Sequence, residues 1–369
     1  MRAERGSSAS RIGVAQGWAE SAAPRIAGLA TAVPPHVVAQ DEAMDFARSC
    51  FGTALPDLER LLPAFLNAGV ESRRLARPAE WYRRSRSFSE KNDAYLDAAF
   101  ALAKESGEKA LVRSGVDRKD IGTLLFVSST GVSTPSLDAH LVPALELSRS
   151  VARMPLWGLG CAGGAAGLGH AAAAVRGTGR AALLISVEIC SVTFMHGDRS
   201  KANLIATALF GDGAAAAVVT PDGEGPTLTR SRSYLLDDST DVMGWSLEPD
   251  GLRVIFARSI PHLAREMTPE LVLDAAGVAD ASALADHVHH YALHPGGSKV
   301  LDAFADTLSL GPERLAPSRE TLRRYGNMSS PTVLFVLDRI LQGTRSTDQP
   351  GLLMALGPGF SAETVLFRW

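Results

Sequence analysis

The sequence contains few of the features that mark secreted, metal-binding or nucleic-acid-binding proteins. Only three of its 369 residues are cysteines, and Cys50, Cys161 and Cys190 are too scattered for a disulfide framework or a zinc site. We therefore expect a protein of the reducing cytoplasm that binds no metal. The formal net charge is only −3 and no block of like charge occurs, which argues against a nucleic-acid partner.

Long apolar runs and a cleavable leader are also missing. The longest apolar stretches, such as VLFVLDRIL, fall well short of the roughly 20 residues that span a membrane, so we expect no integral membrane segment. Residues 1–24 are polar and rich in alanine, serine and glycine, without the apolar core of a signal peptide. We expect them to form a loosely ordered extension.

The sequence does contain one series of features, a strand, a helix and a glycine motif, that occurs twice in the same order. The stretches DIGTLLFVSST and DHVHHYALHPGG each predict a buried strand, and the second ends in His294 and a Pro-Gly-Gly turn. A predicted helix follows each strand, and then a glycine motif, GLGCAGGAAG or RYGNMSSPTV. Ser128 and Cys161 are 33 residues apart, and His294 and Asn327 are also 33 residues apart.

The alternation of strands and helices predicts an α/β protein with mostly parallel sheets. Each glycine motif opens an apolar helix that leads to a further apolar strand, RAALLISVE or PGLLMALGPG. The matched spacing predicts two similar βαβ-rich halves, residues 25–225 and 226–369; two βαβ units that match by chance are the alternative. If the halves pack about a pseudo-dyad, Cys161 of the first faces His294 and Asn327 of the second.

Cys161 is a candidate nucleophile because it stands at the predicted N-terminus of an apolar helix. Unpaired backbone N–H groups at such a terminus carry partial positive charge, which lowers the pKa of a thiol and favours the thiolate. The flanking glycines would let substrate and neighbouring backbone come close. The alternative is an inert cysteine that acts as a small apolar side chain. The repeat and the polar partners that it supplies favour the nucleophile.

His294 and Asn327 are the candidate partners of Cys161. His294 ends a buried strand, where open α/β folds place their ligands, and it could hold a thiolate or donate to an oxyanion. Asn327 could supply a neutral amide donor beside it. The alternatives are a hydrogen-bonded structural histidine and a plain helix N-cap or turn residue. Together the three residues suit thioester chemistry: the cysteine takes an acyl group and the other two stabilise the enolate of a decarboxylating malonyl thioester.

Two further stretches suggest a pocket. LFGDGAAAAVV, residues 209–219, predicts two strands joined by a tight Gly-Asp-Gly turn, with Phe210 presented to a pocket. Near the C-terminus, Gly357 and Gly359 would let a ligand chain approach closely; a turn that needs unusual backbone angles explains them equally well.

From RIAGLATAVPPHVVAQDEA to the C-terminus, the chain resembles a bacterial type III polyketide synthase, of the chalcone-synthase-like branch of the thiolase superfamily. The resemblance rests on the ordered set SSTGVSTPSLDAHL, GCAGGAAG, LFGDGAAA, HPGG, YGNMSS and GPG. It implies a homodimer of thiolase-fold subunits with five αβαβα layers. It implies Cys161 as nucleophile, with His294 and Asn327 as the decarboxylation and oxyanion pair. The substrates it implies are an acyl-CoA starter and malonyl-CoA, with no metal or other cofactor.

The resemblance also assigns pocket residues. Phe210 matches an aromatic gatekeeper, whereas Val254 stands for a second gatekeeper phenylalanine, Trp245 for a small glycine and Cys190 for a threonine of the plant pattern. The remaining pocket positions implied are Ser129, Thr130, Thr193, Ser329, Gly357, Pro358 and Gly359. The departures argue against a plant-like aromatic starter, and the motifs look most like alkylpyrone and alkylresorcinol synthases, which accept fatty acyl-CoA starters.

Some alternatives stay open at this level. Arg73 and Arg74 stand near the place expected for residues that grip CoA phosphates, but a solvated basic turn explains them about as well. A single-round β-ketoacyl synthase of lipid initiation and a non-catalytic thiolase-fold scaffold are the rival functions. Starter length, number of extensions and mode of ring closure depend on pocket shape, which no motif encodes.

Overall fold

The computed structural model describes residues 23–52, 55, 57–278, 284, 287–343 and 349–369. Apart from its last two positions, the extension predicted for residues 1–24 therefore lies outside the described residues. No helix in the described part of the chain is long and apolar enough to cross a membrane.

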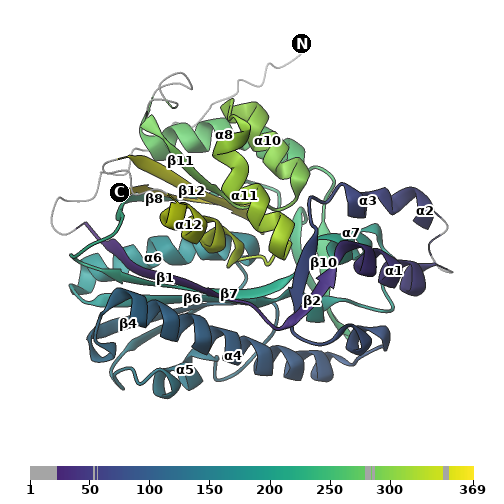
Figure 1. Ribbon diagram of the computed structural model, residues 1–369, viewed down its shortest axis with the longest axis horizontal. Helices are drawn as coiled ribbons and strands as arrows, with labels where there is room; N and C mark the ends of the chain where they lie inside the picture. The colour runs from purple at the N-terminus through teal and green to yellow at the C-terminus, as the bar shows by residue number, and fades with distance from the viewer. Residues whose placement is uncertain (1–22, 53–54, 56, 279–283, 285–286, 344–348) are drawn as a thin grey trace, which may run out of the picture.

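The main structural element is a nine-stranded mixed sheet (Figure 1). Its strands, in spatial order, are β11 (His290–Leu293), β12 (Pro350–Gly357), β13 (Ser361–Arg368), β8 (Thr227–Leu235), β1 (Arg25–Ala32), β7 (Asp212–Thr220), β6 (Ala181–Ile189), β4 (Ile121–Val127) and β5 (Ala152–Leu156). Two small sheets pair β2 (His36–Ala39) with β3 (Ser72–Leu75) and β9 (Met243–Glu248) with β10 (Gly251–Phe256).

The large sheet consists of two half-sheets with the same strand order. Outward from the centre, one runs β1, β7, β6, β4 and the other β8, β13, β12, β11, so each strand has a counterpart. The half-sheets meet at one residue pair, Arg25 and Thr227. The predicted repeat is thus confirmed, with β5 as an extra edge strand; the division at residue 225 stays a prediction.

The expectation of mostly parallel strands is wrong. Among the described strands of the large sheet, three neighbouring pairs are parallel (β4–β5, β4–β6, β11–β12) and five are antiparallel. Only residues 358–360 connect β12 to β13. So short a link makes a hairpin, because parallel neighbours need a crossover of about a dozen residues or more.

Helices cover both faces of each half-sheet. They are α4 (Phe88–Ser114), α5 (Asp138–Ala144), α6 (Gly163–Thr178), α8 (Ile260–Ala276), α10 (Ser298–Leu308), α11 (Pro312–Tyr325) and α12 (Thr332–Gly343). α4 and α5 pack on the outer face of the first half-sheet, α8, α10 and α11 pack on that of the second, and α6 and α12 lie between the two (Figure 1). The order α, β, α, β, α confirms the predicted thiolase fold.

The central helix α6 fits between two half-sheets because its side chains are small. A Cβ added to Gly164 would lie 2.1 Å from the backbone oxygen of Ser330, so the start of α6 touches the chain just before α12. The helix ends at Gly179, whose φ of 67° is the left-handed conformation that glycine favours. Cys161 lies two residues before the first residue of α6 and is therefore held against the second half of the molecule.

A lobe at one end of the sheet completes the fold (Figure 1). It contains the two small sheets with α1 (Gln40–Phe51), α2 (Leu58–Leu61), α3 (Pro63–Leu66) and α7 (Lys201–Leu209). Short 3₁₀ segments in the described residues are η1 (Ala79–Arg83), η2 (Arg118–Asp120), η3 (Gly160–Ala162) and η4 (Cys190–Thr193).

The hairpin predicted over residues 209–219 is wrong. The Ser200 side chain accepts a hydrogen bond of 3.2 Å from the Asn203 N–H, which caps the N-terminus of α7. The helix runs to Leu209, and only the second predicted strand exists, as β7.

Candidate active site

Cys161 lies in the short segment η3, directly before α6. It is 8% exposed, and its thiol is hydrogen-bonded to the side chains of Asn327 and Ser329. Gly160, with φ 47°, makes the turn that presents it. The structure therefore brings Cys161 and Asn327 together across the two halves, as the matched spacing predicts.

Both the backbone and the side chain of Asn327 form hydrogen bonds with backbone groups of other residues. Its N–H donates to the Leu209 carbonyl (2.8 Å), its carbonyl accepts from Gly211 (3.0 Å), and its Oδ1 accepts from the Ser329 N–H (2.8 Å). Its Nδ2 donates to the Gly296 carbonyl at 3.2 Å, in the turn that follows His294. Helix α12 begins only at Thr332, so Asn327 is not its N-cap, but the bond from the Ser329 N–H to Asn327 Oδ1 fits the turn residue that was the other alternative.

His294 follows the last residue of β11 and is buried, 3% exposed. Neither ring nitrogen has a hydrogen-bond partner in the described structure, so the alternative of a hydrogen-bonded structural histidine is wrong. A buried polar ring without partners is costly, and such groups mark ligand or catalytic sites. Asn327 reaches the same turn through Gly296, so all three predicted residues belong to one region.

Burial keeps both Cys161 and His294 neutral in this structure. Burial raises the pKa of the Cys161 thiol to about 11; hydrogen bonds from Ser329 and Asn327 lower it, and the nearby Glu188 carboxylate raises it. Burial lowers the pKa of His294 to about 3. The expected low-pKa thiolate is therefore wrong for this state, because desolvation outweighs the helix N-terminus.

Glu188 is a buried carboxylate that the sequence analysis missed. Its oxygens accept hydrogen bonds from the Ser129 N–H (2.9 Å), the Thr130 hydroxyl (2.8 Å) and the Ser330 hydroxyl (2.9 Å). Burial raises its pKa to about 7. A lone acidic residue inside the apolar strand AALLISVEI was the available signal.

Ser129 and Thr130 therefore have protein partners. Besides its N–H bond to Glu188, Ser129 accepts at its Oγ from the N–H groups of Gly158 and Gly160, both at 3.3 Å, so it fixes the turn before Cys161. The substrate contacts that the resemblance implies for these two residues stay a prediction.

The glycines near the C-terminus serve protein contacts. A Cβ on Gly357 would lie 2.6 Å from the Ala162 Cβ and 2.6 Å from the Leu159 oxygen, and one on Gly160 would lie 2.7 Å from Pro358. Gly359 has φ 133°, which a side chain would strain. Close approach occurs at Gly357, where the neighbouring groups belong to the Cys161 segment; the approach of a ligand chain to these glycines stays a prediction.

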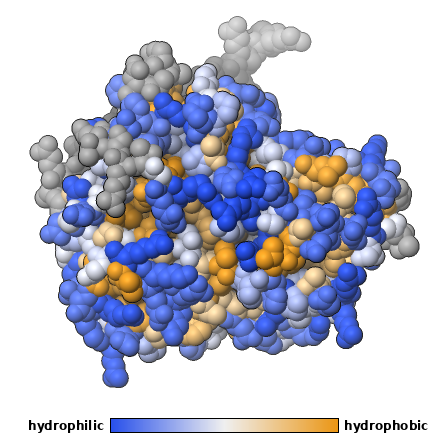
Figure 2. Space-filling model, viewed as in Figure 1, coloured by the Kyte–Doolittle hydropathy of each residue, from blue (hydrophilic) through white to orange (hydrophobic). Residues whose placement is uncertain are grey.

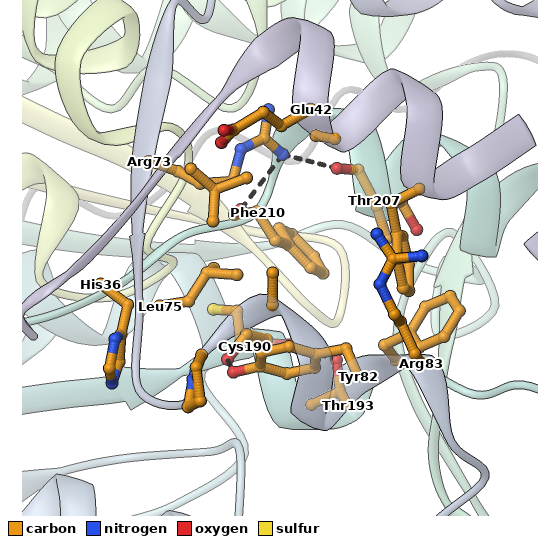
Figure 3. Close-up of a pocket in the computed structure, with 18 of the residues that line it drawn as sticks. His36, Glu42, Arg73, Leu75, Tyr82, Arg83, Cys190, Thr193, Thr207 and Phe210 are labelled. Carbon is orange, nitrogen blue, oxygen red and sulfur yellow. Dashed lines mark hydrogen bonds between the residues drawn. The ribbon is translucent and has the colours of Figure 1, made fainter. Parts of the chain in front are cut away.

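A cavity of about 620 Å³ lies beside Cys190 and Phe210 (Figure 3). It is bounded by β2, α1, β3, η1, η4, α7 and β10, and the predicted pocket residues Phe210, Cys190, Thr193 and Val254 line it. The other predicted residues do not line it: Cys161, His294, Asn327, Ser129, Thr130, Trp245, Ser329, Gly357, Pro358 and Gly359.

Cys190 and Phe210 separate this cavity from Cys161. An ionised Cys161 raises the pKa of Cys190, so the two thiols are near each other. Phe210 lines the cavity with its ring and forms a backbone bridge with Asn327. The ring packs against Phe256 (centroids 5.6 Å apart) and Trp245 (6.0 Å). Phe210 thus stands between cavity and site, where the resemblance places a gatekeeper.

The hydroxyl groups that line the cavity donate to the protein. Thr193 donates to the Cys190 carbonyl at 2.7 Å, and Thr207 donates to the Asn203 carbonyl at 2.8 Å. These protons are not available to a ligand, so the inner walls offer mainly apolar contacts.

Tyr82 and Ser191 form a hydrogen-bonded chain in the cavity wall, which the sequence analysis also missed. The Ser191 hydroxyl donates to the Asp212 carboxylate at 2.5 Å, so the Tyr82 hydroxyl donates to Ser191 at 2.7 Å. The Arg77 N–H donates to the Tyr82 oxygen at 3.3 Å. Burial raises the pKa of Asp212 to about 6. The chain ties η1 to β7 and fixes one wall.

Arg73 is not part of a solvated basic turn. It is 2% exposed and donates to backbone carbonyls at the end of α7. Its guanidinium is therefore not placed to grip CoA phosphates. Arg74 is only partly buried, and its proposed contact stays a prediction.

The layered fold, with a buried cysteine at a central helix and an asparagine and histidine from the opposite half, defines a condensing enzyme of the thiolase-fold class. Comparison with known proteins gives the family. The models for the N-terminal and C-terminal domains of chalcone and stilbene synthases match residues 75–223 and 227–369. The chain therefore belongs to this family, and it is a type III polyketide synthase, an acyltransferase that condenses malonyl-CoA.

Bacterial proteins are among its relatives. A putative chalcone synthase of Bacillus subtilis is 38% identical, over 93% of this chain and 98% of that protein. The 1,3,6,8-tetrahydroxynaphthalene synthase of Streptomyces peucetius is 39% identical over 93% of each chain. The crystal structure of the Streptomyces coelicolor enzyme of that name, a bacterial type III polyketide synthase, has a TM-score of 0.89 at 30% identity, over 94% of this chain and 99% of that one. The match at the level of family weighs against a ketoacyl synthase or a scaffold.

Proposed function

We propose that this enzyme loads a long-chain fatty acyl-CoA starter onto Cys161 and extends it iteratively with malonyl-CoA. The product then cyclises to an alkyl-α-pyrone or an alkylresorcinol. The observation that carries the starter class is the cavity of about 620 Å³ behind Phe210 and Cys190, which falls in the ~300–1,000 Å³ range of small-molecule sites. Its inner walls offer mainly apolar contacts, and its threonine hydroxyls donate to the protein.

The charges at the rim of the cavity support an acyl tail and not CoA as its occupant. The exposed lining residues include three acids, Glu42, Asp45 and Glu80, and one arginine, Arg83. Such a rim repels the phosphates of CoA. A hydrocarbon tail carries no charge and gains about 0.8 kcal/mol for each methylene that it buries.

In the loading step, the Cys161 thiol passes its proton to His294 and its sulfur attacks the thioester carbonyl of the starter. The carbon–sulfur bond to CoA breaks, and the CoA thiolate takes the proton from His294. In the extension step, the carboxylate of malonyl-CoA leaves as carbon dioxide, and the electron pair remains as an enolate that His294 and Asn327 stabilise. The enolate carbon attacks the acyl group on Cys161 and releases the thiolate. We propose that no cofactor beyond the two CoA thioesters takes part.

We propose that two copies of the chain form a homodimer through β5. This strand is one of the two edges of the large sheet, and Met154 in it is 39% exposed and Trp157 after it 59% exposed. Val132 adds a further exposed apolar side chain, 43% exposed. Free strand edges with apolar side chains are surfaces that pair with another chain. Sedimentation of the purified protein should show a dimer, and Trp157→Glu should shift it to a monomer.

The experiment that tests the function combines labelled malonyl-CoA with a panel of acyl-CoA starters from acetyl to stearoyl. We expect labelled products whose masses equal the starter fatty acid plus two or three C₂H₂O units, less the water lost on ring closure, and with a further loss of carbon dioxide for a resorcinol. Cys161→Ala should abolish them, and the matched variant Cys50→Ala should not. Folded wild-type protein that uses malonyl-CoA but incorporates no long-chain starter would overturn the starter class. Full turnover by Cys161→Ala would overturn the mechanism.

A further inference from the structure

Arg73, on β3, is a buried cation whose partners are backbone carbonyls. Its Nη1 donates to the Thr207 carbonyl and lies 3.5 Å from that of Phe210, and its Nη2 donates to Ala208 at 3.1 Å (Figure 3). No carboxylate pairs with it in the described part of the chain. The last carbonyls of a helix carry partial negative charge, so the end of α7 takes the place of a counter-ion.

The other side of the same five residues, 207–211, is held by Asn327. The Leu209 carbonyl accepts from the Asn327 N–H at 2.8 Å, and the Gly211 N–H donates to the Asn327 carbonyl at 3.0 Å. The contact is tight: a Cβ on Gly326 would lie 2.5 Å from the Leu209 oxygen. Arg73 and Asn327 thus form hydrogen bonds with different backbone groups of the same short segment, residues 207–211.

The position of the Asn327 side chain depends on these backbone hydrogen bonds. Its amide is aimed by the position of its own backbone, and from there it reaches the Gly296 carbonyl and the Cys161 thiol. A shift of residues 207–211 displaces the Asn327 backbone and turns the amide away from both. The same shift moves the Phe210 ring at the inner end of the cavity.

We propose that Arg73 is a positioning residue for the condensation: through the end of α7 it holds Asn327 in the geometry that stabilises the enolate. Arg73 also lines the cavity proposed for the acyl tail, so its positioning role is read from the decarboxylation of malonyl-CoA, which needs no starter. The inference rests on the proposed function, because the role of Asn327 is part of that function.

The test is chemical rescue of Arg73→Ala, measured as decarboxylation of malonyl-CoA per folded enzyme. We expect kcat to fall ~10- to 100-fold with KM close to that of the wild type, since small displacements at a reacting centre cost rate and not binding. Guanidinium ion at concentrations far below denaturing ones should restore part of kcat, because it fits the space that the side chain leaves. An unchanged kcat overturns the proposal, and so does a fall that guanidinium does not restore.

Arg118→Ala is the matched control. Arg118 also donates to a carbonyl at the end of a helix, that of Leu145 after α5, at 2.9 Å, but on the outer layer. We expect neither a loss of kcat nor a response to guanidinium. If Arg73→Ala fails to fold, Arg73→Lys is the variant that tests the proposal. Lysine keeps the positive charge but lacks the two guanidinium nitrogens that donate to separate carbonyls. A lowered kcat at unchanged KM supports the proposal, and a wild-type kcat overturns it.

Asn327→Ala separates this inference from the proposed function. If Asn327→Ala decarboxylates malonyl-CoA as fast as the wild type, the proposed role of Asn327 fails, whatever Arg73 does. If it is slow and Arg73→Ala is not, the role of Asn327 holds and only the positioning by Arg73 fails.

Discussion

The carboxylate of Glu188 and the thiol of Cys161 are electrostatically coupled inside the protein. When Glu188 is ionised it raises the pKa of Cys161, and Ser330, which donates to Glu188, stands next to Ser329, which is hydrogen-bonded to the thiol. Burial of both groups makes the coupling strong, because little water screens it. The reactivity of the nucleophile, which burial lowers most, is therefore further reduced by a residue that does not line the substrate cavity.

Glu188→Gln should make Cys161 more reactive. The substitution keeps the shape and removes the charge, so the thiol pKa falls; the gain in alkylation rate stays below about tenfold, because burial is the larger cause of the raised pKa. The measurement is the rate of iodoacetamide alkylation of Cys161 at fixed pH, followed by peptide mass spectrometry. Slower alkylation than in the wild type would contradict the coupling.

The alkylation rate of wild-type Cys161 should climb steadily with pH. Its pKa is about 11 in this structure, so the thiolate fraction grows about tenfold for each pH unit between pH 7 and 10. Ser329→Ala removes a hydrogen bond that lowers the pKa and should shift the whole profile to slower rates. A plateau near neutral pH would show instead that an ion pair with His294 forms in the free enzyme.

Glu188 should make the protein less stable as pH rises from about 5 to about 8, whereas His294, whose pKa burial lowers from 6.5 to about 3, acts in the opposite direction below about pH 6.5. Glu188 has a pKa of about 7 when folded against 4.5 as the reference, so the folded state binds a proton more tightly. The stability that this proton brings is present below pH 4.5 and is lost as pH rises through 7, an effect of about 3 kcal/mol in the free energy of unfolding. Asp212 adds to the same slope, with a pKa of about 6.

Urea unfolding at pH 5.5 and pH 8 measures the slope. Glu188→Gln should flatten it, and Glu105→Gln, on the exposed face of α4, should leave it unchanged. A slope that Glu188→Gln does not alter would mean that this carboxyl is not the titrating group.

Gly164→Ala should damage the protein, and Gly177→Ala in the same helix should not. A Cβ at Gly164 would meet the Ser330 backbone at 2.1 Å, whereas one at Gly177 meets nothing within 4 Å. We expect a loss of about 1–3 kcal/mol for the first, as for other overpacked sites, and a gain of about 0.5 kcal/mol for the second. Thermal unfolding measures both. The activity of Gly164→Ala per folded protein should also fall, so the loss of activity exceeds what the loss of stability explains, because Cys161 moves with the start of α6.

The repeated pattern of the sequence predicted much of the framework. β4, β6, β11 and β12 are apolar runs that stay buried, α6 and α12 follow their glycine motifs, and the equal offsets brought Cys161 to Asn327. These features depend on local pattern and on symmetry, both of which a sequence displays.

What the sequence did not predict depends on distant partners. Glu188 is bound by Ser330, 142 residues away, and Arg73 by Thr207, 134 residues away, and no local pattern announces either pair. The thiol pKa was wrong in direction for the same reason, since burial of Cys161 is a property of the assembled layers. The helix α7 was overlooked because the GDG motif outweighed the capping Ser200.

The position of α6 between two half-sheets has a consequence for how such an enzyme can change. The first seven residues of α6 are all buried, all but one of them glycine or alanine, so almost any larger side chain there meets backbone or packed core. Under the proposed function, substitutions that alter the product spectrum are expected elsewhere, in elements such as η4, α7 and β10, whose side chains line the cavity. The catalytic residues and the residues that line the cavity thus lie in separate stretches of the chain. The cavity-lining stretches can therefore change during evolution while the catalytic stretch is kept.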